Sequence, residues 1–173
     1  ELETHFTANL QLQTGFDYSP PSKALPRYHH ILPAIISGNT GDTPEIDEAG
    51  RYHIRFVFDD AEHPQKQPSI PVRQLQPYGG KQAHAPVGHH FPLRVGTQVA
   101  VGFIDGQLDL PVILGAIPSP SQPSPSDATN PTQHIIRTAS GNEICIDDQA
   151  SSPTLSMATF DHEQHLCLDN SPT

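Results

Sequence analysis

Proline and glycine restrict the fold of this chain more than any other feature of its sequence. The 173 residues include 19 prolines and 12 glycines. Proline removes a backbone hydrogen-bond donor and clashes with the preceding turn of a helix, and glycine is entropically costly inside a helix. Long helices are therefore disfavoured, and we predict an all-β chain of short strands joined by many loops.

Charge narrows the classes of partner that the chain can bind. It has 19 acidic and 9 basic side chains and a net charge of −10. Such a chain repels phosphate backbones and has few cations to displace their counterions, so nucleic-acid binding is disfavoured. No apolar run is long enough to suggest a membrane span. Because the chain starts at Glu1 rather than at methionine, we interpret it as a piece of a longer protein.

Five short strands are expected between Tyr28 and Ile117. The clearest lies within 51–60, where apolar side chains occupy every second position, the period of a half-buried strand. The other four are expected at 29–38, 69–76, 96–104 and 110–117. Five strands are the count of a small barrel such as the OB-fold. The segment 77–92 is longer than a usual connection, and we expect it to be an exposed loop.

The segments that flank this barrel differ from it in composition. Residues 1–12 alternate in part and are expected to form a strand, and 15–33 read as an extended, proline-rich connector. The stretch PSPSQPSPSDATNP after Ile117 is expected to be a semi-rigid spacer. The predicted division is 1–26 for the end of a preceding domain and its connector, 27–118 for the barrel, 119–133 for the spacer and 134–173 for a further sheet.

An internal repeat marks the last part of the chain. EICIDD at 143–148 and HLCLDN at 165–170 align residue by residue, 22 positions apart. On a strand, each copy places two apolar residues on one face and its cysteine, Cys145 or Cys167, on the other, before an acidic turn. So small a sheet cannot enclose a core, and it needs more repeats or other copies of the chain. Two cysteines are too few for a disulfide-dense scaffold, and their redox state is left open.

The acidic loop DGQLD, Asp105 to Asp109, has two interpretations. Its oxygen-bearing residues alternate as in a calcium loop, but glycine is its second residue and no bidentate glutamate follows. Apolar segments flank the loop on both sides. We therefore prefer a connector between two buried strands, in which the Asp-Gly pair supports a hairpin turn.

The histidines are a second candidate for metal binding. They are adjacent at 29–30 and 89–90, and His162 and His165 lie three positions apart. On strands, neighbouring side chains face opposite ways, and so do side chains three positions apart. None of these sets is therefore expected to converge on one ion, and solvated surface histidines are the preferred interpretation.

The sequence does not contain a complete set of residues for nucleophilic catalysis. Ser140 precedes Gly141, but the strand–turn–helix setting of an activated serine is missing, and no basic neighbour activates either cysteine. Asp127 is alone in the spacer, whereas glycoside hydrolysis needs two carboxylates. We assign no catalytic, cofactor-binding or metal-binding residue, and we expect no enzyme activity in this segment.

Three stretches carry a resemblance to a known family. They are GDTPEIDEAGRYHIRFVFD at 41–59, PLRVGTQVAVGFIDGQLDLPVILGAI at 92–117 and IIRTASGNEICIDD at 135–148. They resemble the VgrG family, the valine-glycine repeat spike proteins of type VI secretion. The first two resemble the family's OB-fold barrel, and the third resembles the entry into its β-helical needle. Members commonly have tryptophans in the barrel, and this chain has none.

The resemblance implies an architecture and a function. It implies a five-stranded OB-fold-like barrel at 27–118, the start of a trimeric β-helix after the spacer, and the end of a hub domain in 1–26. The protein would be a homotrimeric structural component of the spike that helps to puncture target membranes and deliver effectors. The implied partners are the Hcp tube, a PAAR-repeat tip protein and effectors, with only transient membrane contact. The spike would be made in the bacterial cytoplasm and secreted without a signal peptide through the type VI apparatus.

A binding module is the alternative to a structural spike. OB-folds also bind nucleic acid or carbohydrate on their barrel surface. The net charge and the missing tryptophans disfavour the nucleic-acid version, because single-strand binders combine basic grooves with stacking aromatic side chains.

Overall fold

The computed structural model describes residues 27–38, 45–58, 71–83, 85–161 and 163–169. The strand expected at 1–12 and the connector up to residue 26 lie outside these ranges. Within them, the regular structure is β apart from one short 3-10 turn, η1 (Ile104–Gly106). The prediction of an all-β chain is therefore confirmed. No helix in the described part of the chain has the length and apolarity needed to cross a membrane.

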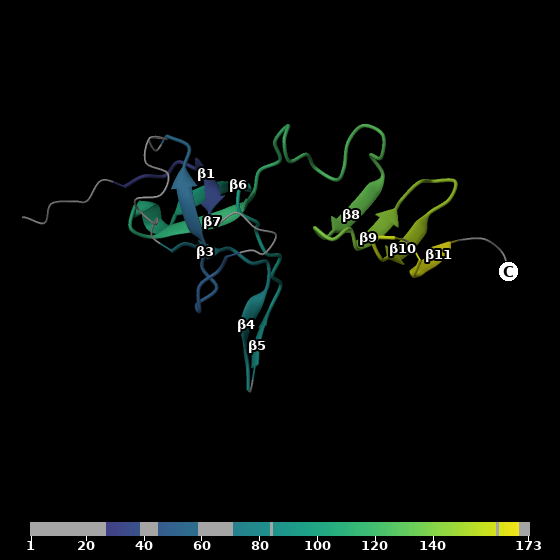
Figure 1. The fold of residues 1–173 in the computed structure, drawn as a ribbon, viewed down its shortest axis with the longest axis horizontal. Helices are drawn as coiled ribbons and strands as arrows, with labels where there is room; N and C mark the ends of the chain where they lie inside the picture. Colours follow the sequence, from purple (N-terminus) through teal and green to yellow (C-terminus); the bar gives the residue numbers. More distant parts are fainter. Residues whose placement is uncertain (1–26, 39–44, 59–70, 84, 162, 170–173) are drawn as a thin grey trace, which may run out of the picture.

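The first sheet has five strands in the order β2-β1-β6-β7-β3 (Figure 1). Its strands are β1 (Leu32–Ser37), β2 (His53–Phe56), β3 (Arg73–Gln74), β6 (Gln98–Phe103) and β7 (Pro111–Ala116). Neighbouring strands are antiparallel except for β3 and β7. A register shift opposite Ala100 and Val101 leaves Leu114 of β7 without a partner in β6, a bulge that helps to bend the sheet. The five strands of the predicted barrel are thus present in one curled sheet.

Tyr52 joins the two edges of this sheet. Its N–H donates to the carbonyl of Val72 at 2.9 Å, and the N–H of Val72 donates back to the carbonyl of Tyr52 at 2.8 Å. Because Tyr52 precedes β2 and Val72 precedes β3, this bridge brings the first and last strands of the sheet together. The curled sheet therefore approaches a barrel, as in the predicted OB-like architecture.

The barrel interior is filled by apolar side chains from alternate strand positions. The buried cluster comprises Ala34, Ile36, Tyr52, Ile54, Val72, Leu93, Val99, Val101 and Ile113. Tyr52 is 0% exposed, and its hydroxyl oxygen accepts the backbone N–H of Leu93 at 3.1 Å. The ring of Tyr52 is therefore packed in the core, while its hydroxyl group has a hydrogen-bond partner.

Two predictions about the barrel strands need correction. The strand expected at 69–76 is represented by β3 alone and by the bridge at Val72, while 69–70 lie outside the described residues. The segment 77–92 was expected to be a loop, but it contains a hairpin of β4 (Gly79–Gln82) and β5 (Ala85–Gly88). The loop prediction failed because this hairpin is rich in glycine and lacks alternating apolar residues, so it gives no amphipathic signal.

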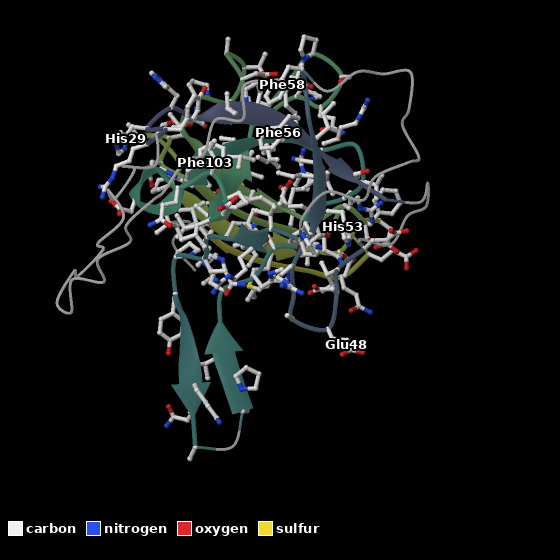
Figure 2. The ribbon with its side chains drawn as sticks, turned by 90° about the vertical axis from the view of Figure 1, so that its left-hand side faces the viewer. His29, Glu48, His53, Phe56, Phe58 and Phe103 are labelled. Carbon is white, nitrogen blue, oxygen red and sulfur yellow. The ribbon has the colours of Figure 1, made fainter. Side chains whose placement is uncertain are left out.

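This β4–β5 hairpin, called the arm below, projects from the barrel in both views (Figures 1 and 2). All residues of its two strands are exposed except Val87, which is half-buried. The arm therefore contributes nothing to the barrel core, and its strands pair only with each other within the described residues.

The second sheet follows the spacer and contains four antiparallel strands. They are β8 (Gln133–Arg137), β9 (Glu143–Asp147), β10 (Thr154–Ala158) and β11 (His165–Asp169), in the order β11-β10-β9-β8. The two copies of the sequence repeat form β9 and β11 and lie on either side of β10. Figure 1 shows this sheet at the opposite end of the molecule from the N-terminal part of the barrel.

Gly106 is required by the turn between β6 and β7. Its φ is +68°, and a Cβ at this position would lie 2.9 Å from a ring carbon of His29 and 3.1 Å from the backbone nitrogen of Tyr28. We expect Gly106→Ala to lower the free energy of unfolding by about 1–3 kcal/mol, because it adds both backbone strain and a clash. Urea denaturation measures this loss. Gly115→Ala is the matched control, since nothing lies within 4 Å of its Cβ position, and an equal effect of both substitutions would contradict the explanation.

Candidate functional surface

One face of the second sheet is apolar and open. Cross-strand pairing places two rows of side chains side by side on this face. The rows contain Ile136, Ile144, Met157 and Leu166, and Ile146, Leu155 and Leu168. Leu166 and Leu168 are 56% and 55% exposed, and the central Leu155 is 39% exposed. Contiguous apolar patches of this kind are typical of interaction surfaces. We call these seven residues the apolar face.

The opposite face of the same sheet carries most of its polar side chains, with Ile135 beside Cys145 among them. Arg137 forms an ion pair with Glu143, and Asp147 accepts hydrogen bonds from Thr132 and Gln133 at 2.7 and 3.0 Å. Cys145 is buried on this face. The sheet is therefore amphipathic, with its large exposed apolar side chains gathered on one face.

The apolar face is hollowed at the end nearer the barrel. An open hollow of about 710 Å³ is lined by Ile136, Ile144, Met157 and Leu166 of the sheet and by Phe91, which follows the arm in sequence. Phe91 is 45% exposed. The root of the arm and the apolar face therefore border the same hollow.

Hydrogen bonds stabilise the ionised form of Asp147. They lower the pKa of Asp147 below its ordinary 3.8, with the Thr132 hydroxyl as the largest cause and the Gln133 amide next. Because the folded pKa is the lower one, this contribution to stability is complete above the unfolded value and is lost as the pH falls through the folded value. We expect Asp147→Asn to reduce the dependence of stability on pH in the acid limb below about pH 4, measured by chemical denaturation at several pH values. Asp109→Asn, at an exposed loop position, is the control and should keep the full dependence.

The acidic loop DGQLD lies between β6 and β7, which pair antiparallel, as the strand-connector interpretation predicts. Asp105 has a φ of 50°, and Gly106 after it also has a positive φ. The Asp105 carboxylate is 2.7 Å from the guanidinium of Arg27. Asp105 thus has an ion-pair partner in the same chain, and the absence of a cation role for this loop remains a prediction.

The histidines are distributed over separate contacts. The ring of His30 packs on Tyr28 with centroids 5.0 Å apart, and His89 packs on Phe91 at 4.8 Å. His90 Nε2 lies 3.4 Å from the hydroxyl of Tyr52. Among the described residues, no three His, Cys, Asp or Glu side chains gather in a metal-binding arrangement. Figure 2 shows His29 at the barrel surface, His165 belongs to β11, and His162 lies outside the described residues.

The candidates for nucleophilic chemistry also lie apart. Ser140 occupies the turn between β8 and β9 next to Gly141, whose φ is +86°. Burial, followed by the charges of Glu143 and Asp147, raises the pKa of the Cys145 thiol, which disfavours the reactive thiolate. Cys167 is exposed on β11. Asp127 accepts hydrogen bonds from the N–H and hydroxyl of Thr129, which lower its pKa, so it serves a local turn. The assignment of no catalytic residue stays a prediction.

Three members of the apolar face were not predicted from the sequence. The repeat predicts the apolar pairs Ile144 with Ile146 and Leu166 with Leu168, but it does not include Ile136, Leu155 or Met157. Alternation in TLSMA, where Leu155 and Met157 are separated by Ser156, is the signal that identifies β10.

Comparison with curated proteins finds type VI secretion spike proteins. The chain is 29% identical over 131 residues to the type VI secretion system spike protein VgrG5 of Pseudomonas aeruginosa, covering 72% of this chain and 16% of the relative. It is 26% identical over 168 residues to spike protein VgrG3 of Vibrio cholerae, covering 85% of the chain and 16% of the relative. It is also 27% identical over 157 residues to the actin cross-linking toxin VgrG1 of Vibrio cholerae, covering 79% of the chain and 14% of the relative. No family model matches the chain.

Proposed function

Because this chain resembles the VgrG spike proteins of type VI secretion over most of its length, we propose that it is a structural segment of such a spike. The chain spans 16% of the length of the first two of these relatives, so the activity and partners of a whole spike protein belong to the proposal. In this role the segment carries out no reaction. It transmits force while the spike helps to puncture a target membrane and deliver effectors.

The apolar face is the observation that carries this proposal. A single copy leaves seven large apolar side chains on one side of a four-stranded sheet. Copies arranged around a common axis bury these side chains against each other, and closed cyclic symmetry satisfies all copies equally. Each buried leucine or isoleucine contributes about 1.5–3 kcal/mol relative to exposure. The predicted homotrimer is the closed arrangement that the resemblance implies.

Force transmission follows from the same arrangement. In a trimer whose core is shared between chains, one chain cannot leave without exposing the apolar faces of the other two. The polar face of the sheet, with its Arg137–Glu143 ion pair, remains in contact with water. The net charge of −10 keeps the assembly soluble.

The remaining partners are proposed from the resemblance. They are the Hcp tube, a PAAR-repeat tip protein and effectors, with export from the bacterial cytoplasm through the type VI apparatus. The domain division of 27–118 for the barrel, 119–133 for the spacer and 134–173 for the start of the needle is part of the same proposal, as is the hub domain ending within 1–26. The second sheet supports the needle portion, because its first strand begins at Gln133. One relative is named as an actin cross-linking toxin, and that activity is not carried over to this chain.

A carbohydrate-binding barrel is the second candidate, because aromatic rings gather on the barrel surface. Phe56 and Phe58 stack with centroids 5.2 Å apart, and Phe103 and Tyr28 continue the row at 6.5 and 5.5 Å. Figure 2 shows the three phenylalanines grouped together. Phe58 is 68% exposed and available for stacking. Titration with soluble glycans, followed by chemical-shift changes at these rings, tests this candidate.

The mass in solution tests the spike proposal. Light scattering at micromolar concentration should give three times the 18.8 kDa of one chain, and the same trimeric state is expected for a longer protein that carries this segment. A folded, stable monomer in both cases would contradict the structural spike and favour the binding module.

A further inference from the structure

The charge of the chain is unevenly distributed along its sequence. Between Glu62 and Asp105 there is no acidic residue, and Lys66, Arg73, Lys81 and Arg94 lie in that interval. From Asp105 to the last residue, Arg137 is the only Lys or Arg among many carboxylates. The arm therefore belongs to a basic part of an acidic chain, and the second sheet belongs to the most acidic part.

The arm carries an available cation. Lys81 is exposed in β4, and no ion pair within the described residues includes it. The arm projects away from the barrel (Figures 1 and 2), and the second sheet lies in a different direction from the barrel (Figure 1). A carboxylate that meets Lys81 is therefore more readily supplied by another molecule than by the sheet of the same chain.

One edge of the arm is open for pairing and the other is blocked. The N–H of His89 donates to the carbonyl of Tyr78 at 2.9 Å, and in an antiparallel ladder hydrogen-bonded and non-hydrogen-bonded pairs alternate. The pairs Gly79 with Gly88 and Lys81 with Pro86 are consequently non-hydrogen-bonded, so their backbone groups point outward. Pro86 has no N–H to offer, which blocks the outer edge of β5.

The outer edge of β4 has the opposite character. It presents the N–H and carbonyl groups of Gly79 and Lys81, the exposed pattern to which an extended segment can add. The root of the arm also borders the apolar face, because Phe91 lines the same hollow as Met157 and Leu166. The arm is therefore continuous with the surface through which the copies are proposed to associate.

We propose that the arm docks on the second sheet of a neighbouring copy, with Lys81 facing its carboxylates and the open edge of β4 toward that copy. This inference rests on the proposed trimer. The neighbour's sheet supplies the opposite charge through exposed carboxylates at the ends of its strands, such as Asp148 after β9 and Asp169 at the end of β11. In a ring of three copies, each arm contacts the second sheet of the next chain, so that every arm and every second sheet takes part in one such contact.

Carbodiimide cross-linking of mixed isotopic copies tests the docking. Light and ¹⁵N-labelled chains are mixed after unfolding and refolding, the oligomer mass is measured, and the reagent joins the Lys81 amine to a carboxylate in contact with it. We expect mixed-isotope peptides that link Lys81 to a carboxylate of 143–169. The Lys81→Gln variant should keep the oligomer mass and lose these peptides.

The outcomes separate this inference from the proposed function. A trimer in which Lys81 yields no interchain peptide, or only peptides within one chain, overturns the docking and leaves the spike segment standing. A chain that stays monomeric both alone and within a longer protein that carries it overturns both. Hydrogen exchange gives a second readout, because docking should slow exchange of the Gly79 and Lys81 amides in the trimer relative to a monomeric variant. Equal exchange of these two amides in trimer and monomer contradicts the open-edge part of the inference.

Discussion

Replacing Leu155 with aspartate is expected to prevent the chain from forming a trimer while leaving each copy folded. Leu155 lies on the central strand β10, opposite Ile146 on one side and Leu168 on the other. In a trimer, the substitution removes an apolar contact from every copy and places a carboxylate where water is excluded. The lost burial is about 1.5–3 kcal/mol per copy, and desolvation of an unpaired carboxylate adds several kcal/mol.

The expected result is a weakening of association by more than about a hundredfold, since 1.4 kcal/mol corresponds to a factor of ten. Light scattering across a concentration series measures it, and circular dichroism checks that the sheet remains folded. Cys167→Asp adds the same charge to the same sheet, but at an exposed position on the opposite face. The control should retain the trimeric mass. A Leu155→Asp protein that also stays trimeric would show that the apolar face is not the interface.

The sequence predicted the parts of the fold where apolar residues alternate. Tyr52 and Ile54 were expected on one face of a strand and are both buried in the core. Phe58 continues the same alternation, yet it is 68% exposed, because β2 ends at Phe56 and the chain turns there. Periodicity shows which face a residue occupies, but the length of a strand depends on its neighbours in the sheet.

The arm was not predictable by the same reasoning. Gly79 and Gly80 begin β4, and Pro86 lies within β5, so the segment has the composition of a loop. Backbone pairing between these strands, continued by the hydrogen bond from His89 to Tyr78, holds the hairpin together without burying a hydrophobic face. Such pairing leaves no periodic signal in the side chains.

The candidate surface was predictable in part. The repeat located β9 and β11 and placed their apolar residues on one face, from which the need for more repeats or for other copies of the chain follows. It gave no indication that β10 lies between the two repeat copies. Nor did it indicate that Phe91, far away in sequence, borders the apolar face. That proximity depends on how the spacer places the sheet beside the barrel, which is a long-range property of the chain.

Tyr52→Ala is expected to destabilise the barrel by about 3–5 kcal/mol, the usual loss when a buried aromatic ring is removed and a cavity remains. The side chain of Tyr52 is 0% exposed and lies where the two edges of the sheet meet. Tyr52→Phe keeps the ring but removes the oxygen that accepts the N–H of buried Leu93 at 3.1 Å. A buried donor without an acceptor costs about 1–3 kcal/mol.

Urea denaturation of Tyr52→Ala, Tyr52→Phe and the control Tyr78→Ala separates ring packing from hydrogen bonding. Tyr78 is 63% exposed near the arm, so its removal should change the free energy of unfolding by less than about 0.5 kcal/mol. If Tyr52→Phe is as stable as the unchanged chain, water or another group must satisfy Leu93. If it is as damaging as Tyr52→Ala, the hydrogen bond of the hydroxyl with Leu93, rather than the packing of the ring, accounts for the loss. We expect Tyr52→Phe to be less stable than the unchanged chain but more stable than Tyr52→Ala. That result would assign most of the contribution of Tyr52 to the packing of its ring and the rest to its hydrogen bond with Leu93.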